Sequence, residues 1–169
     1  MEVFEAVRTV LAVRRYSERR VPTDLVSRIV EAGRLSASAT NSQPWHFIVI
    51  EERATIDKIG AVMDTGRYAA GASLAIAVMI EKDRRIAVSD GSRAIQNMIL
   101  TAWSEGVGSN WIGFGRMPAL EALLGVPDTH QGLALLAFGY PVETIGRGRK
   151  KRKPLGEVAS RGRFGTPFV

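Results

Sequence analysis

A chain of 169 residues that is 46% hydrophobic and 24% charged has the size and composition of a single globular domain. It contains no cysteine, which excludes disulfides, thiolate metal sites and a cysteine nucleophile and fits a reducing cytoplasm. The formal net charge is +6, but six of the 23 basic residues lie between Arg147 and Lys153. Without them 17 basic residues face 17 acidic ones, so the charge is one local patch. Nucleic-acid binding prefers a wide basic face and is therefore not favoured.

The sequence offers no recognisable targeting or membrane segment. Its N-terminus, MEVFEAVRTV, is amphipathic and carries early acids. The apolar run over residues 133–138 is far too short to span a bilayer. We therefore expect a cytoplasmic protein with neither a membrane nor a nucleic acid as its partner.

Hydrophobic periodicity predicts the elements in chain order, beginning with a helix over residues 2–13. Thr23, which follows a proline, is expected to be the N-cap of a second helix that ends near residues 33–36. Asp90 is expected to cap a long helix that reaches about residue 105 and is apolar on several sides, which is typical of a central helix. The other expected elements are strands over residues 46–50, 74–80, 108–114 and 133–139 and short helices over residues 53–63 and 118–124.

This pattern predicts one α+β domain over residues 1–169, with a small sheet packed by helices. Residues 143–169 are basic, rich in glycine and poor in apolar side chains, so they are expected to form an extended arm. Such an arm cannot fold alone. We expect it to lie on a partner's surface, with Phe164, Pro167 and Phe168 as its anchors.

The inventory of reactive residues excludes several classes of enzyme. A dinucleotide fingerprint fails because Trp111 stands where the third glycine after Gly106 and Gly108 belongs. There is no phosphate-binding Gly-Lys-Ser/Thr loop and no G-x-S-x-G motif, and the chain has two histidines, His46 and His130, in no metal-binding pattern. No metal is expected. If the protein is an enzyme, a cofactor carries the difficult chemistry.

Four ordered segments point to one family. The stretch TNSQPWHF over residues 40–47 closely resembles the helix-to-strand loop of the nitroreductase-like family of FMN-dependent NAD(P)H oxidoreductases. Residues 1–22 resemble the N-terminal helix of that family, and residues 92–113 resemble its central helix and the turn under the flavin. The last core strand and the C-terminal arm of the family are matched by FGYP over residues 138–141 and RKPLGEV over residues 152–158.

The resemblance implies a fold, an assembly and a chemistry. The fold is a small mixed or antiparallel sheet packed by helices, in a homodimer that holds two FMN molecules at its interface. The implied reaction takes a hydride from NAD(P)H to flavin N5 and on to a nitroaromatic, a quinone or a similar small acceptor, so no side chain is expected to be catalytic itself.

Family roles are carried over to the positions that match. Ser38 and Asn41 are expected to face the flavin, often that of the partner, and Gln43 either joins them or braces the loop. Arg14 is expected near flavin N1 and O2, where a cation stabilises the charge of the reduced ring. The turn beneath the ring is expected to be formed by Trp111, Ile112, Gly113 and Phe114.

One departure concerns the cofactor phosphate. Val10-Leu11-Ala12 stands where the family commonly has Arg-Arg-Ser, and it has no cation to offer. Either the basic arm holds the phosphate, with Lys151, Arg152 and Lys153 as ligands, or FMN binds weakly and another ligand is used. We favour the arm. A phosphate dianion needs two or three charge-assisted hydrogen bonds, and the arm has enough donors.

Two alternatives to this function stay open. One is a specialised relative that cleaves flavin, removes halogens or uses deazaflavin. The other, kept open by the apolar segment at residues 10–12, is a non-catalytic protein that binds or sequesters a flavin or deazaflavin.

Overall fold

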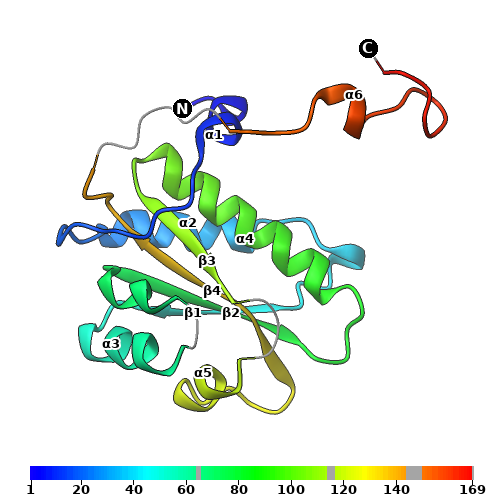
Figure 1. The fold of residues 1–169 in the computed structure, drawn as a ribbon. Coiled ribbons are helices and arrows are strands. Elements are labelled where there is room, and N and C mark those ends of the chain that lie inside the picture. The colour runs from blue at the N-terminus through cyan, green and yellow to red at the C-terminus, as the bar shows by residue number, and fades with distance from the viewer. Residues whose placement is uncertain (64–65, 114–116, 144–149, 169) are drawn as a thin grey trace.

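The computed structural model describes residues 1–63, 66–113, 117–143 and 150–168 (Figure 1). The four strands form one antiparallel sheet in the order β1-β2-β4-β3, so the α+β prediction is confirmed, in its antiparallel form. The strands are β1 (Trp45–Ile50), β2 (Leu74–Glu81), β3 (Gly108–Ile112) and β4 (His130–Gly139). The helices are α1 (Val3–Thr9), α2 (Thr23–Arg34), α3 (Arg53–Val62), α4 (Ala87–Ser104), α5 (Pro118–Leu123) and α6 (Leu155–Val158), with 3₁₀ turns η1 (Ala39–Asn41) and η2 (Arg67–Gly71).

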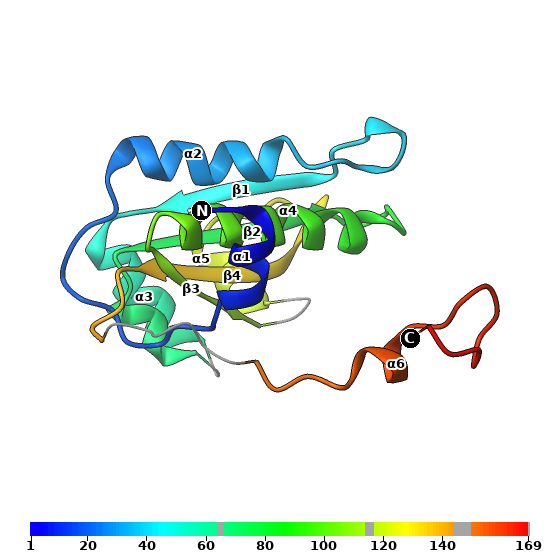
Figure 2. The same ribbon diagram turned by 90° about the horizontal axis from the view of Figure 1, so that it is seen from above.

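Helices cover both faces of the sheet (Figure 2). The central strand β2 is buried on both sides, because its side chains alternate between two apolar clusters. Leu74 and Ile76 pack with α2 and α4, whereas Ala75 and Ala77 pack with α3 and α5. The continuous apolar run of this strand reflects burial on both faces, and the sheet forms the middle layer between two groups of helices.

Two predicted helix starts are wrong. Thr23 is the first residue of α2, and Pro22 occupies the N-cap position. Helix α4 begins at Ala87, one turn before the expected cap at Asp90. The carboxylate of Asp90 is fully buried. This carboxylate accepts a hydrogen bond from a neighbouring loop and pairs with Arg93 on the same helix.

The helix predicted over residues 2–13 is also wrong beyond Thr9, where α1 ends. Ala12 forms a parallel bridge with Ser109, and the Val13 N–H donates to the Ser109 carbonyl over 2.8 Å. The open edge of β3 therefore binds this segment in an extended form, and helical periodicity in the sequence could not reveal that partner. The close approach requires Gly108, because a Cβ there would lie 2.8 Å from Val13 Cβ.

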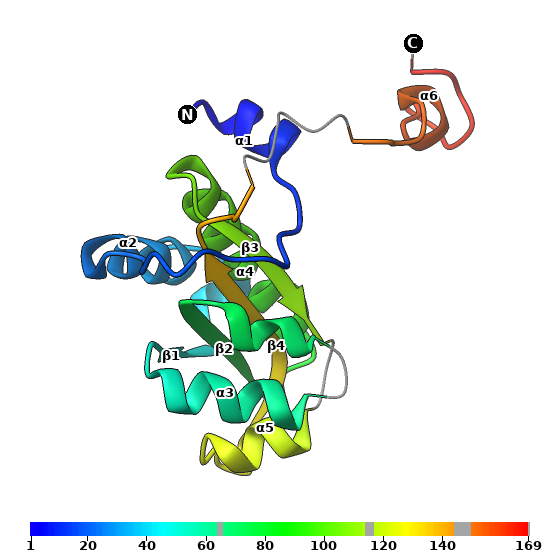
Figure 3. The ribbon, with the colours of Figure 1, turned by 60° about the vertical axis from the view of Figure 1, so that its left-hand side comes forward.

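The C-terminal arm, residues 150–168, runs away from the sheet (Figures 1 and 3). Its tip closes on itself through a bridge between Ser160 and Pro167, and almost all of its residues are exposed. Lys150 joins the arm to the body, donating from Nζ to the Val7 carbonyl over 2.6 Å. The contact of the arm with a partner subunit stays a prediction. In the described part of the chain, none of the helices has the length and apolar character needed to cross a membrane.

Candidate functional site

The loop between α2 and β1 has a strained and well-defined backbone. Thr40, Asn41 and Gln43 have positive φ angles of 53°, 54° and 49°, a conformation that costs non-glycine residues about 1–3 kcal/mol each. Ser38 Oγ accepts the Gln43 N–H over 3.0 Å, and Gln43 Nε2 donates to the Asn41 carbonyl over 3.3 Å. Asn41 is exposed. Internal hydrogen bonds thus stabilise one conformation of the loop, in which Asn41 is exposed to solvent.

Helix α4 holds this loop at two points. Asp90 Oδ2 accepts the Ala39 N–H over 3.1 Å, and Asn97 Nδ2 donates to Ser36 Oγ over 2.7 Å. Asp90 also forms an ion pair with Arg93. Asp90 and Asn97 are seven residues apart, which places them on one face of the helix. Sequence reasoning missed both clamps because their partner is fixed only by tertiary packing.

A groove with a volume of about 940 Å³ lies beside the open edge of β3. One wall is the extended segment that follows α1, and another is the middle of α4. The arm closes one end. Its lining residues are Val7, Arg8, Val10, Leu11, Ala12, Gln96, Ile99, Ser109, Asn110, Trp111, Lys150 and Arg152. The two ends of the chain and its middle therefore contribute to one hollow.

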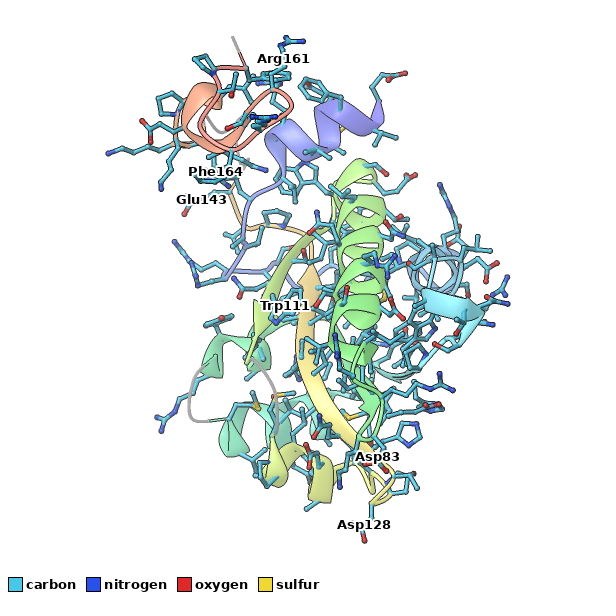
Figure 4. The ribbon with its side chains drawn as sticks, turned by 90° about the vertical axis from the view of Figure 1, so that its right-hand side faces the viewer. Asp83, Trp111, Asp128, Glu143, Arg161 and Phe164 are labelled. Carbon is cyan, nitrogen blue, oxygen red and sulfur yellow. The ribbon has the colours of Figure 1, made fainter. Side chains whose placement is uncertain are left out.

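Trp111 lies on the sheet side of the groove (Figure 4). The Ser109 carbonyl points to the segment at Val13, so the backbone of Trp111, two residues on, points to the same edge. Trp111 Nε1 donates to the Gly113 carbonyl over 2.9 Å. Gly113 has a φ of 72°, and a Cβ there would lie 2.8 Å from Met117 Sδ, so the turn after β3 needs glycine.

The other predicted turn residues differ in place. Ile112 is buried in the cluster beneath the sheet and does not line the groove. Phe114 lies outside the described residues. Of the predicted turn, Trp111 is thus the residue that reaches the groove, and Gly113 shapes the turn that follows it.

Arg14 lies over the ring of Tyr68, with 5.7 Å between its Cζ and the ring centroid. Tyr68 in turn donates its hydroxyl to Asn110 Oδ1 over 2.8 Å. Tyr16 lies nearby, and its pKa is raised above the ordinary value, first by burial and then by Tyr68, against an opposing effect of Arg14. Arg14 does not line the groove. Its charge sits beside the β3 edge, held by the Tyr68–Asn110 pair.

Only alternate residues of the basic arm face the groove. Lys150 and Arg152 line it, whereas Lys151 and Lys153 do not, as expected for an extended chain whose alternate side chains point in opposite directions. The pKa of Lys150 is lowered, first by burial and then by the charge of Arg152. Among the three predicted arm residues, Arg152 lies in the groove, and Lys150 is a groove cation that the sequence did not single out.

Within one chain the predicted residues therefore form two groups. Trp111 and Arg152 share the groove, with Arg14 beside it, whereas Ser38, Asn41 and Gln43 lie in the loop and do not line the groove. The loop clamp at Asp90 and the groove residue Gln96 are six residues apart on α4, or about 9 Å along the helix axis. In the described part of the chain, no group of three or more acidic or histidine side chains is arranged to hold a metal.

Comparison with known proteins gives consistent results. The sequence profile of the family described as Nitroreductase family matches residues 8–70 and 67–140. A protein of Methanothermobacter thermautotrophicus with the provisional name NADH dehydrogenase/NAD(P)H nitroreductase is 34% identical over 154 residues, which cover 86% of this chain and 81% of that protein.

Solved structures share the fold. A nitroreductase with bound FMN from Bacteroides fragilis has a TM-score of 0.79 and 26% identity, with coverage of 94% of this chain and 98% of that one. An FMN-dependent nitroreductase from Clostridium difficile has a TM-score of 0.86 at 19% identity, with coverage of 95% and 99%. The fold expected from the resemblance is thereby confirmed.

Proposed function

This chain belongs to the nitroreductase family, and on that premise we propose that it is an FMN-dependent oxidoreductase that uses NAD(P)H to reduce a small acceptor such as a nitroaromatic or a quinone. The groove along the β3 edge is the observation that carries the proposal. Its volume of about 940 Å³ is in the range of cofactor sites. It combines an exposed backbone edge for a planar ring with cations at one end for a phosphate.

The residues of the groove fit the parts of FMN. Lys150 and Arg152 would bind the phosphate by charge-assisted hydrogen bonds. The backbone of Trp111 would hold the ring edge, and Arg14, which lies beside the groove and does not line it, would stabilise negative charge on the ring. When bound, FMN supplies the hydride-transfer chemistry. The protein positions the ring, excludes water with the apolar wall of Val10 and Leu11, and sets the local charge.

We also propose a homodimer in which the loop carrying Ser38 and Asn41 completes the groove of the other copy. Two unpartnered surfaces support this. The arm exposes Leu155, Val158 and Phe164, and Figure 4 shows Phe164 and Arg161 on the arm, away from Trp111. Exposed apolar side chains of this kind mark interaction surfaces.

The second surface is a groove of about 1170 Å³ beside α1. Phe4, Trp103 and Tyr140 give it an apolar lining, and its acidic residues Glu2, Glu5 and Glu143 outnumber its one basic residue, Arg19, which suits a basic arm. Light scattering at micromolar concentration should give about twice the 18.4 kDa mass of one chain. A monomeric mass would contradict the dimer.

One alternative has a specific observation behind it. Val10, Leu11 and Ala12 line the groove without any charge, which suits a non-catalytic protein that sequesters a flavin or deazaflavin. A titration of the FMN-loaded protein with NADH and NADPH separates the two. Bleaching of the flavin absorbance, followed by its return when a quinone or nitroarene is added, supports the oxidoreductase. A flavin-loaded protein that neither nicotinamide reduces supports the sequestering role, and failure to bind either FMN or riboflavin contradicts both.

A further inference from the structure

The last turn of α1 presents a cation to the groove that the sequence pattern does not indicate. Arg8 lines the groove two positions before Val10, where the apolar segment that replaces the family's usual cations begins. The side chain of Arg8 is 44% exposed, so its guanidinium can reach a ligand without any rearrangement of the core. Helix α1 thus offers one positive group to this site, although residues 10–12 offer none.

Arg8 does not stand alone at this end of the groove. Lys150 Nζ donates to the carbonyl of Val7, the residue next to Arg8, over 2.6 Å, and Arg152 lines the same groove. Three cations, from α1 and from the arm, therefore line the same groove. The pKa of Lys150 is lowered, first by burial and then by repulsion from the charge of Arg152. An anion among them would relieve this repulsion.

Glu5 already holds Arg8. Arg8 Nε donates to Glu5 Oε2 over 2.9 Å and Arg8 Nη2 donates to Glu5 Oε1 over 2.7 Å, so Glu5 binds the Nε–Nη2 edge of the guanidinium. This geometry is also the one that a guanidinium uses to bind a phosphate. A phosphate carries close to two negative charges at neutral pH and the Glu5 carboxylate carries one.

We propose that Arg8 is a third ligand of the cofactor phosphate and that Glu5 competes with the phosphate for its guanidinium. The assignment rests on the proposed function, because it places the FMN phosphate in this groove. It moves the phosphate site from Lys151, Arg152 and Lys153 to Arg8, Lys150 and Arg152. It also gives the site a built-in competitor, so that Glu5 sets how tightly FMN is held.

The test compares FMN with riboflavin, which lacks the phosphate. Dissociation constants for both are measured by quenching of flavin fluorescence, for the full chain and for its Arg8→Ala and Glu5→Gln variants. Arg8→Ala should weaken FMN binding by about tenfold, the equivalent of one charge-assisted hydrogen bond, and leave riboflavin binding unchanged. Glu5→Gln should strengthen FMN binding, again without an effect on riboflavin.

Arg34→Ala is the matched control. Arg34 forms the same two-pronged pair with Glu31 in the last turn of α2, with both distances 2.7 Å, and it does not line the groove. It should leave both flavin affinities unchanged. If the wild-type chain binds FMN and Arg8→Ala leaves that affinity unchanged, or weakens FMN and riboflavin equally, the assignment of Arg8 is wrong while the proposed function stands. If the wild-type chain binds neither flavin, both are wrong.

Discussion

Asp90, a fully buried carboxylate in the first turn of α4, accepts the backbone N–H of Ala39 over 3.1 Å. This bond ties the strained loop to a helix that is itself fixed against the sheet. It fixes Ala39, the residue directly before those with positive φ angles. The same loop carries Ser38 and Asn41. The positions of these two proposed cofactor contacts therefore depend on Asp90, which is not itself a proposed cofactor contact.

Asp90→Ala should lower the free energy of unfolding by about 1–3 kcal/mol, because it leaves a part-buried N–H of Ala39 without its acceptor. Asp90→Asn keeps an oxygen at that position and should cost less. Urea unfolding followed by circular dichroism measures both. Asp57→Ala is the control, since it removes an exposed ion pair with Arg53 on α3 and should change stability by less than about 1 kcal/mol. Equal losses in Asp90→Ala and Asp57→Ala would contradict the clamp.

The two faces of the arm predict different effects from substitutions that remove the same charge. Lys150→Ala with Arg152→Ala takes away two groove cations and should weaken FMN binding by well over tenfold, at about 1.5 kcal/mol or more for each charge-assisted bond. Lys151→Ala with Lys153→Ala removes two charges that do not line the groove and should have a small effect. Flavin fluorescence quenching at fixed ionic strength measures both. A larger loss in the second pair would restore the site predicted from the sequence.

The pKa of Lys150 predicts a pH dependence. Burial and Arg152 lower this pKa, so the unfolded chain binds the Lys150 proton more tightly than the folded chain. The resulting cost to stability is present below the lowered pKa and is relieved as the pH rises from there towards the ordinary pKa of 10.5. A bound phosphate favours the protonated form, so FMN affinity should fall as the pH rises through the lowered pKa.

Lys150→Arg tests this assignment, because arginine stays protonated throughout that range. FMN dissociation constants measured from neutral to alkaline pH should rise less steeply for the variant than for the wild type. Parallel curves for the two proteins would show that another group titrates.

Gly108→Ala should displace the segment at Val13, which adjoins the groove. The added Cβ would lie 2.8 Å from Val13 Cβ. Val13 Cβ is attached directly to the backbone, so rotation of the side chain cannot move it out of the way. We expect a loss of about 1–3 kcal/mol in the free energy of unfolding, as for other overpacked sites, together with weaker flavin binding, since the neighbouring Ala12 lines the groove. Gly71→Ala is the control, because nothing lies within 4 Å of its new methyl group. Thermal unfolding of both variants should show a much smaller loss of stability for Gly71→Ala, and equal losses would contradict the overpacking at Gly108.

Local sequence patterns predicted the elements that are buried by general hydrophobic packing against the sheet. The run LAIAVMI indicated a buried strand, and β2 is one, because apolar residues at every position satisfy two clusters at once. The strand predicted over residues 108–114 ends earlier, at Ile112, because Gly113 has a positive φ and turns the chain there, where the family resemblance implied a turn. These features depend on neighbours in the sequence or on general burial.

Features that depend on one distant partner were missed. Residues 10–13 have apolar side chains at helical spacing, yet the β3 edge pairs with Ala12 and Val13 and draws them out of the helix. Asp90 has the sequence context of a helix cap, but its carboxylate accepts a hydrogen bond from a loop residue 51 positions away in the sequence. Arg8 and Lys150 reach the groove only because the chain ends meet there. No periodicity or spacing encodes contacts of that kind.

The hydrogen bond between Lys150 and Val7 closes a span of 143 residues. Contacts of such long range form late in folding, since the entropy of a long loop must be overcome first, and α1 has only seven residues, too few to persist alone in water. We therefore expect the end of the groove that holds the phosphate in our proposal to assemble late and to open early. A ligand bound there would hold α1 and the arm in place together. Protection of these two segments from proteolysis would therefore report how much of the site is occupied by ligand.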